Sequence, residues 1–238
     1  MNVTMRVLSA AGGAAACGLA LWAGLWGAAD ASARTAKNEV ARWEQGGAIP
    51  RDADPDATLA VALRAVERDP QNGDYRMLVG KIHEWKAVAH PVWSSPARRE
   101  RDEAVRWYRQ TVALRPSDSL AWVSLAQSRF FNQRLDAETF GALERAGIFG
   151  PWEEVTQLKA AWLGMALWNN LPEPLKDAHR RSLQRMFMFH KLVYQLTVMA
   201  YQFDWLDELR GLTDDPRAHE VIERQVGWLK EGTSGNQY

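Results

Sequence analysis

The sequence has almost no cysteine. Its 238 residues include one, Cys17, and that residue lies within an apolar run near the N-terminus. The rest of the chain therefore has no thiols to form a disulfide, no cysteine nucleophile and no thiolate ligand for a zinc ion.

An excess of charge of one sign is also missing. The chain has 29 basic and 29 acidic residues, so it lacks the basic surface with which proteins bind nucleic acids. Histidine is scarce, and the tempting segment "HEWKAVAH" places His83 and His90 seven residues apart. The zinc-protease motif needs two histidines at positions i and i+4 of a helix. We therefore predict no nucleic-acid partner, no metal, no cofactor and no catalytic residue.

Tryptophan, in contrast, is abundant, with 12 residues in the chain. A tryptophan supplies a large rigid surface, either for packing between helices or for contact with a ligand such as a sugar ring. Packing is the simpler explanation for most of those in the central region, which are Trp85, Trp93, Trp107, Trp122, Trp152, Trp162 and Trp168. Trp93, in "HPVWSSP", is the one that packing explains least, and we expect it to face outward.

The N-terminus contains an uncharged stretch, Val7 to Ala29, of 23 residues. As a helix, this stretch is long enough to span the ~30 Å hydrocarbon core of a membrane. Two interpretations of residues 1–33 stay open. The small residues Ala31 and Ala33 flank Ser32 as in a signal-peptidase site, whereas Trp22 and Trp26 suit the interface of a retained anchor.

Either interpretation predicts export of the remaining chain. A retained segment makes the protein a single-pass inner-membrane protein with its bulk in the periplasm. A cleaved one releases the protein into the periplasm.

From residue 34 onward the apolar spacing predicts helices and turns, without a convincing strand. We expect a helix and linker over residues 34–52, a helical region over 53–170 and capping helices over 171–238. The predicted fold class is all-α.

The helical region contains marks that recur at a fixed distance. Ala126 and Ala161 are 35 residues apart, as are Pro116 and Pro151, whereas Gly80 precedes Ala126 by 46 residues. The longer interval is explained by an insertion around "HPVWSSPARRER". A period near 34 residues is typical of helix–turn–helix repeats.

The segment "AVRWYRQTVALRPSDSLAWVSLAQ" resembles the junction between two tetratricopeptide units. A small residue at one position lets two helices approach closely, and an aromatic residue fills the space beside it. The predicted repeat-signature residues are Gly80, Ala104, Tyr108, Pro116, Trp122, Leu125, Ala126, Pro151, Trp152 and Ala161. The resemblance implies a tetratricopeptide-like helical-repeat solenoid behind the N-terminal transmembrane or signal segment.

Two charged groups are candidates for functional contacts. Arg98, Arg101 and Arg109 follow Trp93 and are candidates to face a ligand or partner, although a solvated helix face with ion pairs would give the same pattern. The adjacent pair Glu153-Glu154 would project ~100° apart on a helix. That geometry suits a helix N-terminus better than the paired acids of a glycosidase.

The segment "ALERAGIFGPWEEVTQLKAAWLGMALWNNL" resembles the VpsP-type polysaccharide biosynthesis proteins in its "GPWE" turn, the following glutamine and the tryptophan near the helix end. This resemblance implies a role in bacterial exopolysaccharide production and brings no catalytic residues with it. We therefore expect a non-catalytic, periplasm-facing scaffold whose partners are proteins of a synthesis and export complex, with polysaccharide contact as an added expectation. The alternatives are an adaptor of another envelope machine, such as cytochrome maturation or envelope assembly, and a glycan-acting enzyme.

Overall fold

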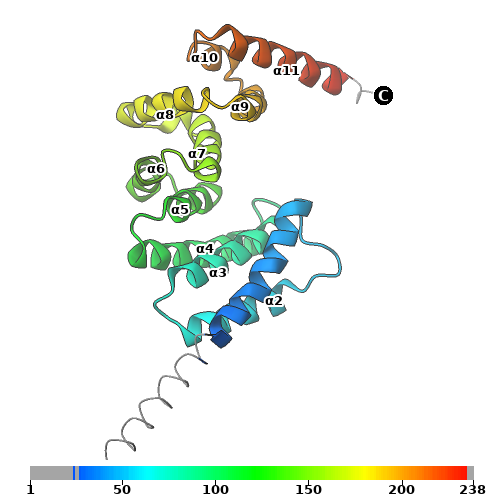
Figure 1. The fold of residues 1–238 in the computed structure, drawn as a ribbon, viewed down its shortest axis with the longest axis vertical. Coiled ribbons are helices and arrows are strands. Elements are labelled where there is room, and N and C mark those ends of the chain that lie inside the picture. The colour runs from blue at the N-terminus through cyan, green and yellow to red at the C-terminus, as the bar shows by residue number, and fades with distance from the viewer. Residues whose placement is uncertain (1–23, 25–26, 235–238) are drawn as a thin grey trace, which may run out of the picture. The chain divides into compact units, whose positions relative to one another are not determined.

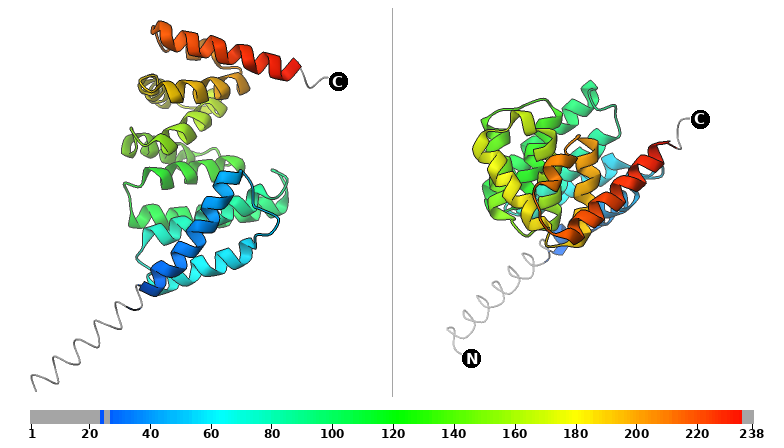
Figure 2. Two further views of the ribbon diagram at one scale, coloured as in Figure 1. Left: turned by 45° about the vertical axis from the view of Figure 1, so that its right-hand side comes forward. Right: turned by 90° about the horizontal axis from the view of Figure 1, so that it is seen from above.

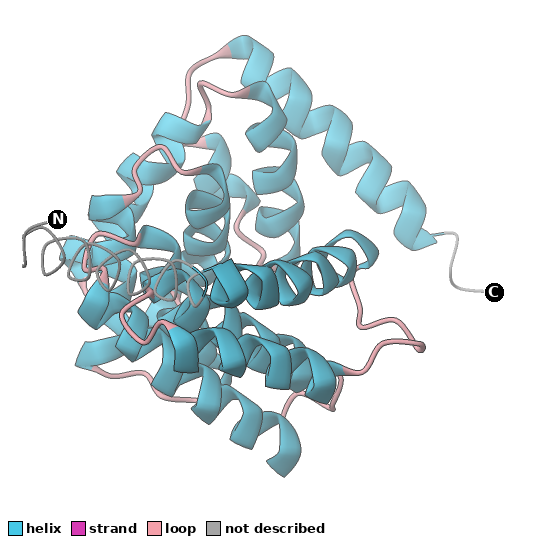
Figure 3. Cartoon of the chain, turned by 60° about the horizontal axis from the view of Figure 1, so that its bottom comes forward, coloured by secondary structure: helices cyan, strands magenta, loops and turns pink. Residues whose placement is uncertain are grey.

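The computed structural model describes residues 24 and 27–234, and all regular elements in this part of the chain are helices (Figure 3). The predicted all-α fold class is confirmed for these residues. The chain divides between Pro116 and Ser117 into two compact units, which we call unit 1 and unit 2.

None of the helices within the described residues is long and apolar enough to cross a membrane. Most of the uncharged N-terminal stretch, including Trp22 and Trp26, lies outside the described residues.

Unit 1 contains an N-terminal helix over residues 27–46, followed by α2 (Pro55–Arg68), α3 (Gly73–Val88) and α4 (Ser95–Leu114). Polar side chains begin the last three helices by accepting hydrogen bonds from free backbone N–H groups, as helix caps do. These caps are Asp54, Asn72 and Ser94. The helix α2 ends at Arg68, because the residue before Pro70 avoids helical backbone angles.

The N-terminal helix starts before residue 34, where we expected the first helix of the exported region, and runs through the predicted cleavage site. Figure 2 shows it in the darkest blue, lying across the rest of unit 1. Its buried face enters the same core as α2 and α3 through Ala29, Ala33, Ala36, Val40 and Trp43. The spacing of three and four residues is that of one helical face.

The segment around the predicted cleavage site is also tied to α2 by polar contacts. The Arg68 guanidinium donates to the Ser32 hydroxyl over 2.7 Å and to the Ala28 carbonyl over 2.9 Å. Residues 27–33 are therefore part of the folded unit 1.

The helices α3 and α4 form an antiparallel hairpin, seen side by side in Figure 1. Their close approach depends on Gly80, because a Cβ atom at this position would lie 2.5 Å from Cε1 of the fully buried Tyr108. The small-plus-aromatic arrangement expected from the sequence is thus present at this pair.

Unit 2 contains α5 (Ser119–Phe131), α6 (Ala137–Phe149), α7 (Glu154–Ala166), α8 (Glu173–Met186), α9 (His190–Gln202), the short α10 (Leu206–Arg210) and α11 (Pro216–Ser234). A single 3₁₀ turn, Trp168–Asn170, follows α7. In Figure 1 these helices follow one another as a stack of hairpins.

Contacts in unit 2 repeat at intervals close to one hairpin. The helices α5, α7 and α9 pack in sequence, and α6 packs against α8. Side chains 35 to 37 residues apart bond across these contacts, as Ser119 does to Thr156 over 3.0 Å and Lys159 to Ser124 over 3.2 Å. The stacking continues through α8, past residue 170, where we expected the capping helices to begin.

Aromatic side chains fill the core of unit 2. Trp162 packs among the rings of Phe130, Phe131 and Phe203, and Trp168 packs edge-on against Trp205. For these tryptophans, packing between helices is the observed role.

Candidate functional site

The repeat-signature residues lie mainly in the interior of their helices. Five of them are at most 2% exposed, namely Ala104, Tyr108, Leu125, Ala126 and Ala161. Trp122 is partly buried beneath the guanidinium of Arg145, 4.9 Å from the ring centre. Pro116 lies in the exposed turn that follows α4. For the buried members and for Trp122, the observed role is packing between helices.

Of the four residues predicted to face a ligand or partner in unit 1, three are exposed and one is buried. Trp93 is 55% exposed in the α3–α4 turn, and Arg98 and Arg109 are exposed on α4. Arg101 differs, because its side chain is buried and donates to the Val92 carbonyl over 2.6 Å. Arg101 therefore supports the turn from inside and does not face a partner.

A polar network around the buried His83 joins three helices of unit 1. The Nδ1 atom of His83 lies 2.7 Å from Oε2 of Glu100, and Lys86 bridges Glu100 and Asp56 at 3.0 and 2.8 Å. Burial lowers the pKa of His83, although its hydrogen bond to Glu100 acts in the opposite direction. Among the described residues, no group of three or more His, Cys, Asp and Glu side chains could hold a metal ion.

The turn between α6 and α7 contains Gly150, Pro151 and Trp152. Pro151 lies in the turn, and α7 begins at Glu154 after Glu153. Glu153 and Glu154 do stand at the helix N-terminus, where Glu154 pairs with Lys191 over 2.6 Å. Trp152, one of the predicted repeat-signature residues, is 63% exposed.

Residues other than Trp152 hold the backbone of this turn in place. Gly150 ends α6 at a point where a Cβ atom would overlap the Ser119 side chain. The buried Gln157 amide donates to the Gly150 carbonyl over 2.6 Å, and its oxygen accepts from Ser182. The close packing and these hydrogen bonds fix the backbone, so Trp152 is left free to face solvent.

The exposed Trp152 lies at the mouth of a pocket of about 180 Å³. The α6–α7 turn forms one side of the pocket, and the α8–α9 turn contributes Phe189, which is 50% exposed. Met186 and Leu192 supply further apolar walls, and Arg185 reaches in from the end of α8.

A second, wider pocket lies beside the first, between α6 and α8. Arg185 lines both pockets, and Arg181, one helical turn earlier on α8, lines the second. Within the described part of the chain, neither guanidinium forms an ion pair or hydrogen bond, and the Nε atom of Arg185 is buried. We call the two adjoining pockets the α8 groove.

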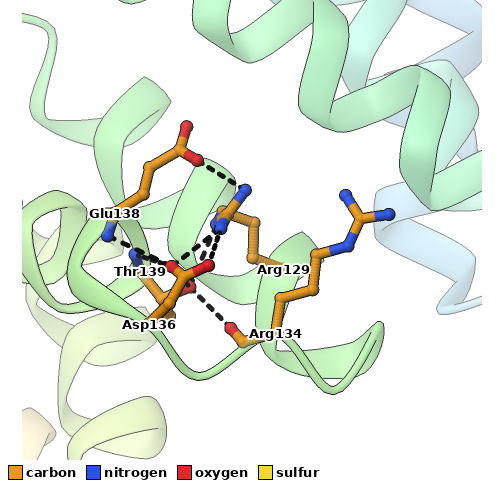
Figure 4. A network of polar contacts seen from close by, with 5 residues as sticks. All are labelled: Arg129, Arg134, Asp136, Glu138 and Thr139. Carbon is orange, nitrogen blue, oxygen red and sulfur yellow. Dashed lines mark hydrogen bonds and ion pairs between the residues drawn. The ribbon is translucent and has the colours of Figure 1, made fainter.

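Arg129, a fully buried arginine of unit 2, shows the opposite condition. Arg129, at the end of α5, is 3% exposed and binds both carboxylate oxygens of Asp136, at 2.6 and 2.7 Å (Figure 4). Glu138 and Thr139 accept its remaining hydrogen bonds at 2.6 and 3.0 Å. This network closes the α5–α6 turn, where Gln133 adopts a positive φ of 60°.

Sequence patterns did not identify the α8 groove, because the segment "HRRSLQRMFMFHKL" was interpreted as part of buried capping helices. A signal was nevertheless present. Arg181 and Arg185 are four residues apart, and Arg185 has no acidic residue at three or four positions on either side. Like charges at this spacing disfavour a helix unless they serve another contact.

Comparisons with known proteins give a limited result. No protein-family model matches the sequence, and no curated protein matches it. Two solved structures, described as crystal structures of MamA protein and of MamA, align with 87% and 81% of this chain and with 96% and 95% of their own. Their sequence identities are 13% and 12%, and the TM-score is 0.47 for both. The VpsP-type resemblance stays a prediction.

Proposed function

We propose that this chain is a non-catalytic, tetratricopeptide-like scaffold that binds protein partners. The observation that carries the proposal is the apolar surface at the α6–α7 and α8–α9 turns of unit 2. Its members are large side chains between 43% and 68% exposed, namely Ile148, Phe149, Trp152, Val155, Met188 and Phe189. Apolar side chains that gather on an otherwise polar surface mark interaction sites.

The repeated architecture supports the same proposal. Stacked hairpins bury one continuous core while leaving their turns free to vary, which suits them to binding other proteins. The tight locking of the α6–α7 turn by Gly150 and Gln157 presents Trp152 on a rigid support. A rigid aromatic anchor binds with little loss of conformational entropy.

The scaffold is held at the inner membrane by its N-terminal segment, with both units in the periplasm. Retention of this segment is supported by unit 1, since cleavage after Ala33 would remove Ala29 and Ala33 from the core and Ser32 from Arg68. The N-terminal sequence of the protein purified from its native membrane tests this point. A new N-terminus at Arg34 would contradict retention.

The process that the scaffold serves is exopolysaccharide biosynthesis and export. This part of the proposal rests on the sequence resemblance of the "GPWE" region alone. Deletion of the gene should abolish or strongly reduce secreted polymer, and the wild-type gene should restore it. Unchanged polymer would remove this assignment and leave another envelope assembly as the process served.

The binding proposal is tested by site-specific photocrosslinking in living cells. A photoreactive residue at Val155, 57% exposed beside Trp152, should yield discrete crosslinked proteins. The same residue at the exposed Glu220 of α11 serves as the control position. If Val155 gives no products beyond those of Glu220, this surface does not bind a protein.

A further inference from the structure

The α8 groove combines an apolar pocket with two guanidinium groups, those of Arg181 and Arg185, that have no partner among the described residues. The pocket beneath Trp152 and Phe189 has a volume of about 180 Å³, which suits one large side chain. At its inner edge the guanidinium of Arg185 turns a buried Nε–H toward no acceptor in the described chain. The two features meet at one residue, so a ligand that fills the pocket also reaches the charge.

An unpaired buried donor is energetically unfavourable. A guanidinium N–H removed from water without an acceptor loses about 1–3 kcal/mol relative to a bonded one, and more where charge is involved. Arg129 shows that unit 2 can satisfy a buried arginine fully with Asp136, Glu138 and Thr139. No side chain of the described residues accepts a hydrogen bond from the Arg185 guanidinium. A carboxylate supplied by a ligand is the group that fits a guanidinium best.

The charges around the groove favour an anionic ligand. Lys191 and Glu154 neutralise each other at 2.6 Å. Of the remaining lining charges, Arg181 and Arg185 outnumber the single acid, Glu144. One carboxylate brought by a ligand would balance the groove.

We propose that the α8 groove binds a segment of a partner protein that carries an acidic side chain beside a large apolar one. The carboxylate pairs with Arg185 and Arg181, and the apolar side chain fills the pocket between Trp152 and Phe189. This inference rests on the proposed scaffold function and specifies the chemistry of the partner.

A peptide is favoured over an acidic polysaccharide by the lining of the pocket. Sugar hydroxyl groups require many polar partners, whereas Met186, Leu192 and Phe189 offer none. The buried Gln157 amide already binds Gly150 and Ser182, so it has little capacity for a sugar. An acidic glycan is therefore the competing occupant that the experiment must be able to detect.

The test uses the full chain and two libraries of short synthetic peptides. One library fixes Asp or Glu next to randomised positions, and its twin replaces those acids with Asn or Gln. We expect binders from the acidic library that contain Leu, Phe or Trp near the acid, with affinities at least ~10-fold above their amide twins, as one charged hydrogen bond provides. Equal binding of the amide twins would overturn the inference.

Matched variants then locate the site by fluorescence anisotropy with the tightest peptide. Arg185→Gln and Trp152→Ala should each weaken binding at least ~10-fold, whereas Arg217→Gln and Trp228→Ala should stay within about twofold. Trp228 is a close control, being 58% exposed in the same unit. If Arg185→Gln fails to fold by circular dichroism, the exposed Arg181→Gln replaces it and should weaken binding severalfold. Affinity unchanged in the folded arginine variant contradicts the proposal.

Two further outcomes separate the possible failures. Displacement of the peptide by a polyuronate oligosaccharide, lost in Arg185→Gln, would assign the groove to an acidic glycan and overturn the peptide. Crosslinks from Val155 that persist unchanged in Arg185→Gln cells would overturn the acidic-ligand inference while leaving the scaffold function in place. Absence of both crosslinks and peptide binding would overturn both.

Discussion

Arg129 and Arg185 are both arginines at helix ends of unit 2, yet their surroundings differ. The guanidinium of Arg129 is enclosed by acceptors from the next helix, and it fastens the α5–α6 turn. The guanidinium of Arg185 lies between two pockets with a buried Nε–H that nothing in the described chain accepts. A buried guanidinium bonded to carboxylates supports the fold, whereas an unbonded buried N–H at the edge of a pocket indicates a place for a ligand.

His179 lies on the same helix as Arg185 and also has a buried nitrogen atom without a hydrogen-bond partner among the described residues, but its side chain is neutral. Its ring is buried between Trp168 and Trp205, and its Nε2 atom has no hydrogen-bond partner in the described chain. Burial, together with the neighbouring Arg180, lowers its pKa to about 4. His179 is thus held neutral by packing, and protonation works against the fold.

The largest expected effect is the loss of the bonded arginine. Arg129→Ala should lower the free energy of unfolding by about 3 kcal/mol, the lower end for a broken buried pair because Asp136 and Glu138 can return to water. Urea denaturation followed by circular dichroism measures this value. As a control, Arg180→Ala removes a more exposed pair with Asp177 and should cost less than about 1 kcal/mol. Equal costs for the two variants would show that the network in Figure 4 is not a structural fastening.

The second prediction concerns pH. The unfolded chain binds a proton at His179 near pH 6.5, but the folded chain resists it until about pH 4, so stability falls as the pH decreases between these values. At pH 5 the loss attributable to this residue should be about 2 kcal/mol, at 1.36 kcal/mol per pH unit. The variant His179→Leu should lack this part of the pH dependence in urea titrations. The exposed His90→Gln should retain it, and a loss in both would exclude His179 as the source.

The third prediction tests the close packing beside His179. A Cβ atom at Gly164 would overlap the imidazole ring, which Trp168 and Trp205 prevent from moving aside. Gly164→Ala should therefore destabilise unit 2 by about 1–2 kcal/mol. Hydrogen exchange of the α7 and α8 amides reports this locally. Gly227→Ala, in α11 with no atom within 4 Å of its added Cβ, should instead stabilise its helix by about 0.5–1 kcal/mol.

Sequence patterns predicted the helices and their close contacts better than the placement of individual polar side chains. Helical periodicity gave the all-α fold, and the small-plus-aromatic pair Gly80 and Tyr108 does meet across α3 and α4. The same patterns were wrong about Arg101, because nothing in a helical sequence shows that a long cationic side chain folds back onto the Val92 carbonyl. They also missed the α8 groove, whose walls come from turns far apart in the chain.

The smallest expected effect is also the sharpest test of the contrast between the two arginines. Replacing Arg185 by methionine removes the unbonded Nε–H and keeps much of the side-chain volume, so stability should rise by about 0.5–1 kcal/mol in urea denaturation. Arg129→Met, the matched change at the bonded residue, should still lose about 2 kcal/mol or more. Opposite signs would mean that Arg185 is retained at a cost to the fold, as expected of a residue that serves a ligand. A comparable loss of stability in both variants would mean that Arg185 is a structural residue. Arg185 would then not be assigned to ligand binding in the α8 groove.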